Sequence, residues 1–163
     1  MSVRGTIGGV AAVLTCVVLT PRAASAQPQT VNIAIPAGVS FLVSDVSVST
    51  PGSPSTTRIS FDTVTNFGRN DNVRISVRAD SSTFSGPGTT RIAASRVSWT
   101  ATASTGSASD GTLSASAFRQ VYTSPKQPTS GSVDLSWTLG AIAAAGLRAG
   151  THTLTVRWRI ESQ

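Results

Sequence analysis

Two pairs of arginines are the residues of this chain whose type and spacing offer the clearest chemistry. Arg74 and Arg78 alternate with apolar residues in one segment, and Arg157 and Arg159 do the same near the C-terminus. Because the side chains of a β-strand alternate between its two faces, all four guanidinium groups are expected on the polar sides of their strands. Guanidinium groups bind carboxylates and phosphates. If the two strands share a sheet, the sequence predicts a basic surface for an anionic ligand.

The same arginines also have a simpler interpretation. Three acidic residues also lie in or next to predicted strands: Asp80, Asp134 and Glu161. Ion pairs with these acids across strands would each contribute only about a few tenths of a kcal/mol. At the level of the sequence both interpretations stay open: a binding surface, or isolated surface ion pairs.

Residues for catalysis are scarce. His152 is the only histidine, the chain has seven acidic residues, and no serine lies in a nucleophile-elbow pattern. The acidic residues form no motif of the kind that would pair two carboxylates for glycoside hydrolysis. We therefore expect no enzyme, no catalytic residues and no cofactor.

A metal site is also not expected. The oxygen-rich segment NFGRNDN at residues 66–72 could hold Ca²⁺, but it lacks the spacing of an EF-hand, and an Asn/Asp turn accounts for it without metal.

The first 26 residues have the pattern of a secretory signal peptide. Arg4 precedes an apolar run at residues 7–19, and Ala24, Ser25 and Ala26 form an A-x-A cleavage site. The run is shorter than the roughly 20 residues that span a bilayer. We expect cleavage after Ala26 and a secreted, cell-surface or periplasmic protein with no transmembrane segment in its mature chain.

Cleavage would also change the composition. Cys16 is the only cysteine; acylation at this residue is the alternative processing, but Thr15 stands where a small residue is expected. Without Cys16 the mature chain has no disulfide and depends on its core. Loss of Arg4 and Arg22 lowers the net charge from +6 to near +4. The remaining arginines are scattered, with no aromatic-basic motif, so we expect no nucleic acid partner.

The elements that position these residues are predicted strands. From residue 27 onward, apolar residues alternate with polar ones between turns rich in Ser, Thr, Gly and Pro. The predicted strands lie around residues 31–35, 41–48 (with a bend at 44–45), 59–61, 73–79, 97–103, 113–121, 133–139 and 154–160. The segment GAIAAAGLRAG, residues 140–150, predicts a short helical crossover. Seven or eight strands separated by turns indicate one all-β domain over 27–163, an antiparallel immunoglobulin-like β-sandwich.

The three tryptophans are expected in the core. Trp99, Trp137 and Trp158 each share the face of their predicted strand with apolar neighbours two residues away. An exposed aromatic surface for sugar rings would need the opposite phase, so core packing is the favoured interpretation.

The order of the segments RISVRADSSTF, RIAASRVSWTATA and AGTHTLTVRWRI resembles secreted bacterial β-sandwich domains, including the WxL cell-surface domain and the spore-coat and fimbrial types. The resemblance covers most of residues 57–161. Trp137-Thr138-Leu139 matches one W-x-L motif, and Trp158-Arg159-Ile160 stands where the WxL domain has its second. For that domain the resemblance implies attachment to peptidoglycan. Fimbrial-type relatives usually carry a disulfide.

Together these observations predict an exported, non-catalytic β-sandwich with a structural or adhesive role at the cell surface or in the periplasm. Its expected partner is a cell-envelope polymer or another surface protein, including a second copy of itself. Two alternatives remain. One is a module that binds an anionic glycan or the cell wall through its arginines. The other is a fimbria-like subunit in which residues 30–35 serve as a donor strand for a neighbour's sheet.

Overall fold

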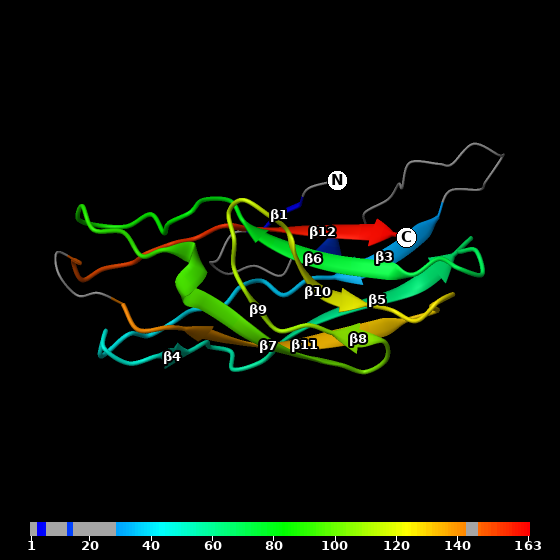
Figure 1. Ribbon diagram of the computed structural model, residues 1–163, viewed down its shortest axis with the longest axis horizontal. Coiled ribbons are helices and arrows are strands. Elements are labelled where there is room, and N and C mark those ends of the chain that lie inside the picture. Colours follow the sequence, from blue (N-terminus) through cyan, green and yellow to red (C-terminus); the bar gives the residue numbers. More distant parts are fainter. Residues whose placement is uncertain (1–2, 6–12, 15–28, 143–146) are drawn as a thin grey trace.

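Two antiparallel β-sheets pack face to face in the computed structural model, which describes residues 3–5, 13–14, 29–142 and 147–163. Figure 1 shows the two layers from the side, with β12, β6 and β10 lying above β5, β11 and β7. The predicted all-β sandwich is confirmed. Seven of the described strands have five or more residues, in keeping with the seven or eight expected.

The first sheet has the strand order β1, β12, β6, β10, β8, with the bounds Val3–Gly5, Val156–Ser162, Val73–Ala79, Arg119–Thr123 and Ser107–Ala108. The second sheet has the order β2, β3, β5, β11, β7, β9, with the bounds Val13–Leu14, Thr30–Ala34, Thr57–Thr65, Gly131–Leu139, Val97–Ala103 and Gly111–Thr112. The short strand β4 (Thr50–Pro51) also pairs with β11, and a single 3-10 turn, η1 (Ala94–Arg96), precedes β7.

The core lies between the sheets and contains all three tryptophans, as the sequence predicts. Trp99 and Trp137 are opposite each other in the pairing of β7 with β11, and their ring centroids are 5.6 Å apart. Trp158 reaches across from β12, with its centroid 6.4 Å from that of Trp137. None of the three is more than 7% exposed. Their burial follows from the period-two pattern, which puts alternate residues of each strand inside.

The strand expected at residues 41–48 is not present, so this prediction is wrong. In this region Ser40 forms an isolated bridge with Ser53, and residues 41–48 contain no strand. The side chains still alternate, because Val39, Phe41 and Val43 are half-buried whereas Leu42 is exposed. The segment runs between the two sheets and is held by its inward side chains, since it lies along no ladder of backbone hydrogen bonds.

The strand expected at residues 113–121 is present only at its end, so most of this prediction is wrong. β9 ends at Thr112 and β10 begins at Arg119. Between them the Ser114 hydroxyl accepts hydrogen bonds from the backbone N–H groups of Ser116 and Ala117, both at 3.3 Å. A serine that bonds its own neighbours in this way favours a turn over a continuous strand.

Two other predictions fall mainly outside the described residues. Of the expected helical crossover at 140–150, residues 143–146 are not described, and the described residues on either side of them contain no helix. The signal peptide and its cleavage site also lie outside, apart from β1 and β2, which pair with β12 and β3. Among the described residues, no helix is long and apolar enough to cross a membrane.

Candidate functional site

The four arginines singled out in the sequence lie on two neighbouring strands of the first sheet. Strand β6 carries Arg74 and Arg78, and strand β12 carries Arg157 and Arg159. In the register of the two strands Arg157 is opposite Arg78. Their neighbours Val77 and Trp158 are buried in the core, so the arginines lie on the outer side of the sheet. We call this surface, formed by Arg74, Arg78, Arg157 and Arg159, the basic face.

An aromatic ring lies within the basic face. The guanidinium carbons of Arg78 and Arg159 lie 4.9 Å and 4.4 Å from the ring centroid of Phe118. At these distances a guanidinium group and a ring attract each other through a cation–π interaction. Phe118 therefore holds one arginine from each strand. Sequence reasoning missed this role, because Phe118 reaches the arginines only after the chain has turned at Ser114.

Two of the four arginines form ion pairs. Arg157 Nη2 contacts Asp80 Oδ1, and Arg159 Nε lies 3.4 Å from Glu161 Oε1, in a geometry that is not a hydrogen bond. Arg74 and Arg78 form no ion pair with the part of the chain that the structure describes. The ion-pair interpretation thus holds for half of the set, and the basic face keeps an excess of two positive charges.

The arginine side chains lie close to the sheet. The Nε atoms of all four are buried and have no hydrogen-bond acceptor among the described residues. Ser76, which lies opposite Arg159 in the register, is only 3% exposed although it lies on the outer side of its strand. The side chains of Arg157 and Arg159 are still 23% and 39% exposed. Because Nε is buried, that exposed area belongs to other atoms of each side chain.

The outer side of the second sheet is different. It carries mainly serine and threonine, together with one ion pair, in which Arg58 Nε and Asp134 Oδ1 are 2.7 Å apart. The hydrogen bond from Arg58 lowers the pKa of the Asp134 carboxyl below its ordinary value of 3.8. Asp134, one of the acids that could have paired with the basic face, is therefore already paired on the other side of the sandwich.

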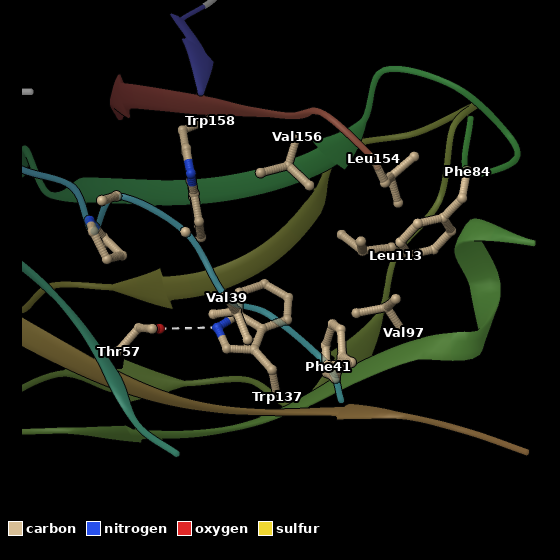
Figure 2. A pocket seen from close by; sticks show the side chains of 13 residues that line it. Val39, Phe41, Thr57, Phe84, Val97, Leu113, Trp137, Leu154, Val156 and Trp158 are labelled. Carbon is tan, nitrogen blue, oxygen red and sulfur yellow. Dashed lines mark hydrogen bonds between the residues drawn. The ribbon is translucent and has the colours of Figure 1, made fainter. Parts of the chain in front are cut away.

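A small cavity lies between the sheets, as Figure 2 shows. Its volume is about 60 Å³, and Val156 and Trp158 of β12 line it from one side. Val39 and Phe41 of the segment between the sheets also line it. The Trp137 indole Nε1 donates a hydrogen bond of 2.9 Å to Thr57 Oγ1 in its wall, so these two polar groups satisfy each other. The cavity is suited only to an apolar group of a few atoms.

The residues weighed for catalysis and metal binding do not come together. His152 Nε2 lies 3.1 Å from the backbone oxygen of Arg148, at the start of the last segment. In the segment at 66–72, Asp71 Oδ2 accepts hydrogen bonds of 2.7 Å from the Gly68 N–H and from Gln29 Nε2, as in an Asp-closed turn. Within the described ranges, no group of three or more His, Cys, Asp or Glu side chains is placed to hold a metal ion.

Comparisons with family models, with curated proteins and with solved structures give no match to this chain. Any statement about function therefore depends on the geometry of the described residues.

Proposed function

We propose that this protein is an exported, non-catalytic β-sandwich that adheres to an anionic polymer of the cell envelope through its basic face. The observation that carries the proposal is the presence of four arginines on two adjacent strands with only two acids to balance them. Like charges directly opposite each other in a sheet, such as Arg78 and Arg157, are destabilising. An anionic ligand would remove that cost.

Phe118 supports the proposal because it orders two of the arginines before any ligand arrives. Its contacts with Arg78 and Arg159 restrict side chains that otherwise carry about 2 kcal/mol of rotamer entropy. A preorganised site loses less entropy when it binds. The export signal in the sequence supports a location where such polymers are found.

The test replaces all four arginines of the basic face with glutamine. Retention of the wild type on isolated cell envelopes should fall as salt rises through about 0.15 M, where the Debye length is about 8 Å. The quadruple variant should be retained weakly at every salt concentration. The matched control is a second quadruple glutamine variant with the same change in charge at four exposed arginines elsewhere: Arg69, Arg91, Arg96 and Arg148.

The control variant should keep most of the retention, and both variants should unfold cooperatively. Equal loss in the two variants would mean that net charge, not the basic face, governs adhesion. Equal retention of all three proteins would remove electrostatic adhesion from consideration.

A second candidate function is assembly by strand addition, because a strand of only two or three residues covers one edge of each sheet. β12 pairs with β1 and β3 pairs with β2, and both partners lie in the segment expected to be removed on export. Loss of that segment would leave β12 and β3 open to a strand of another chain. The proposed donor segment at residues 30–35 is itself largely strand β3, paired with β5, so donation would require its release.

Size-exclusion chromatography of the mature chain over a range of concentrations tests this candidate. Assembly by strand addition predicts polymers that grow with concentration, and a monomer at all concentrations contradicts it.

A further inference from the structure

Strand β12 forms an edge of the first sheet that is suited to a second copy of this chain. We propose that β12 pairs antiparallel with β12 of that copy, around a two-fold axis at Ile160. Dimerisation and adhesion are separate properties, since adhesion needs only the basic face of one copy.

The outer edge of β12 is largely open among the described residues. β1 pairs only with Val156, Arg157 and Trp158, and β1 lies in the signal peptide that we expect to be removed on export. Its removal leaves all seven residues of β12 without a neighbour on that side in the described part of the chain. An open edge of this length is a template for a strand of another chain.

Among the described edges of the two sheets, β12 is the most regular. Its pairing with β6 runs through seven consecutive residue pairs with no shift of register. β3, the edge of the second sheet on the side of the signal peptide, has five residues and a shift of register between Thr30 and Asn32. β8 and β9, at the other edges, have two residues each. β12 therefore offers the longest uninterrupted row of backbone groups to a partner strand.

Alternate residues of β12 direct their backbone groups to the open edge. Gln163, which follows β12, exchanges two backbone hydrogen bonds with Asn72, so its N–H and C=O groups face β6. In an antiparallel pair this direction alternates along the strand. The groups that face the open edge therefore belong to Val156, Trp158, Ile160 and Ser162. A partner strand must place residues of this set opposite one another, which also keeps the basic faces of both copies on the same outer side.

The charges of β12 favour one of the remaining registers. With the axis at Ile160, residues 158–162 of the two copies pair, and Arg159 lies opposite Glu161 of the second copy in both directions. With the axis at Arg159 or at Glu161, that residue lies opposite its own counterpart. With the axis at Trp158, Arg157 lies opposite Arg159. Opposite charges across a strand pair are stabilising and like charges are destabilising, so the axis at Ile160 is favoured.

Arg159 and Glu161 have exposed area with which to form these contacts. Their side chains are 39% and 32% exposed, and within one copy Arg159 Nε lies 3.4 Å from Glu161 Oε1 without a hydrogen bond. Arg157 already contacts Asp80, so it gains less from a register that places it opposite an acid. Around the axis at Ile160, Arg159 and Glu161 form non-hydrogen-bonded pairs, in which side chains across an antiparallel ladder are closest. The two copies together therefore form a ring of four alternating charges.

The inner side of the same edge is apolar. Ile160 packs against the core but is only partly buried. Around the axis it meets Ile160 of the second copy, and burial of this remaining apolar area favours association. Because both copies use the same strand, the pairing is closed at a dimer.

Reversal of one charge at a time tests this register. R159E places two carboxylates opposite each other across the axis, and E161R places two guanidinium groups there, so each variant should dimerise at least about tenfold more weakly than the wild type. Sedimentation equilibrium of the secreted protein over a range of concentrations measures the dissociation constant. R96E, which has the same change in net charge as R159E at an exposed site elsewhere, should dimerise like the wild type.

A mixture of the two variants distinguishes the register from a general effect of charge. One copy of R159E beside one copy of E161R restores opposite charges at both places. The equimolar mixture should therefore dimerise about as strongly as the wild type, although neither variant does so alone. With the axis at Arg159, R159E alone would stay a dimer, because it only exchanges one pair of like charges for another.

A backbone variant tests the pairing independently of charge. The N–H of Ser162 faces the open edge, so S162P removes a donor that the partner strand needs and β6 does not. S162P should lose the dimer, whereas S162A should keep it. Far-ultraviolet circular dichroism checks that each variant is folded; if a charge reversal unfolds the chain, S162P and S162A decide.

Several results would overturn the inference. One is a wild type that is monomeric at all concentrations; another is a series of polymers larger than a dimer, which would support the donor-strand candidate instead. Charge-reversed variants that dimerise like the wild type, or a mixture that stays monomeric, would show that the register around Ile160 is wrong. Adhesion through the basic face is tested separately, by the quadruple glutamine variant.

Discussion

The Trp137 side chain packs against residues of both sheets. Its ring contacts Trp99 of its own sheet and Trp158 of the opposite sheet, and its indole N–H bonds the Thr57 hydroxyl. Replacing Trp137 with alanine removes the ring and leaves the Thr57 hydroxyl without this donor. We expect the free energy of unfolding to fall by roughly 3–5 kcal/mol, measured by chemical denaturation.

Ser136→Ala is the control for that variant, because Ser136 is the exposed neighbour on the same strand. It should change the free energy of unfolding by about 0.5 kcal/mol or less. A Trp137→Ala variant as stable as the wild type would contradict the core position of this side chain.

At Tyr122 we expect a substitution that does not lower the free energy of unfolding. Its side chain is fully buried between the sheets, and its hydroxyl has no hydrogen-bond partner among the residues that the structure describes. A buried polar group without a partner costs stability. Tyr122→Phe should therefore leave the free energy of unfolding unchanged or raise it by up to about 1 kcal/mol. A loss of more than about 1 kcal/mol would show that the hydroxyl is satisfied in solution.

For single residues, the sequence predicted on which face of the sheet a side chain lies, but not which other side chains it contacts. Alternation placed the tryptophans inside and the arginines outside, because the face of a side chain in a strand depends only on its phase. It did not predict that Phe118 contacts Arg78 and Arg159. That contact joins three separate segments, and it exists only because the turn at Ser114 brings one of them back over the sheet.

Among the elements, the segment at residues 36–43 is held by its inward side chains and, at Ser40 alone, by a backbone bridge to Ser53. Val39 packs closely over Gly52, where an added Cβ would lie 2.5 Å from Val39 Cγ1 and 3.2 Å from Trp137 Cβ. Gly52→Ala should push the segment away from the sheet and lower the free energy of unfolding by about 1–3 kcal/mol. Thermal unfolding and proteolysis near Leu42 measure the two effects.

Gly140→Ala is the matched control, since the nearest atom to an added Cβ there is the Arg96 backbone oxygen at 3.4 Å, an ordinary contact. It should have little effect on either measurement. If Gly52→Ala were as stable and as resistant to proteolysis as this control, the close packing of Val39 on Gly52 would be wrong.

The same segment shows why a strand could be expected at residues 41–48 and not found. A period of two reports that the chain is extended and that one side of it is buried. A strand also needs a neighbouring edge with free N–H and C=O groups. The segment at 36–43 has the first condition, since Val39 and Phe41 point inward. It meets the second at one residue only, because Ser40 bridges Ser53 and the pairing goes no further. The sequence contains no signal for that difference.

For the whole molecule, the distribution of charge distinguishes the two outer surfaces. The first sheet presents the basic face, whereas the second presents serines, threonines and the paired Arg58 and Asp134. Alternation predicted which residues point outward. It could not predict that β6 and β12 are adjacent, because residues 80–155 separate them in the sequence and they meet only through the topology of the sheet.

The export prediction also belongs to the whole molecule. The cleavage pattern at Ala24, Ser25 and Ala26 leads us to expect that the secreted protein begins at Gln27. N-terminal sequencing or intact mass of the secreted material measures this directly. A chain that begins at Cys16 and carries an acyl mass would establish the lipoprotein alternative.

The contacts among the three tryptophans make the packing of the two sheets measurable by circular dichroism. Trp99 and Trp137 meet through the pairing of β7 with β11, whereas Trp137 and Trp158 meet only where the two sheets are packed together. Coupled indole transitions in circular dichroism therefore have two sources, one within a sheet and one between sheets. If the sheets separate while their strands persist, as in a molten globule, the second source disappears first. Comparison of this signal with the far-ultraviolet signal of the strands distinguishes loss of packing from loss of the fold, with no label attached to the protein.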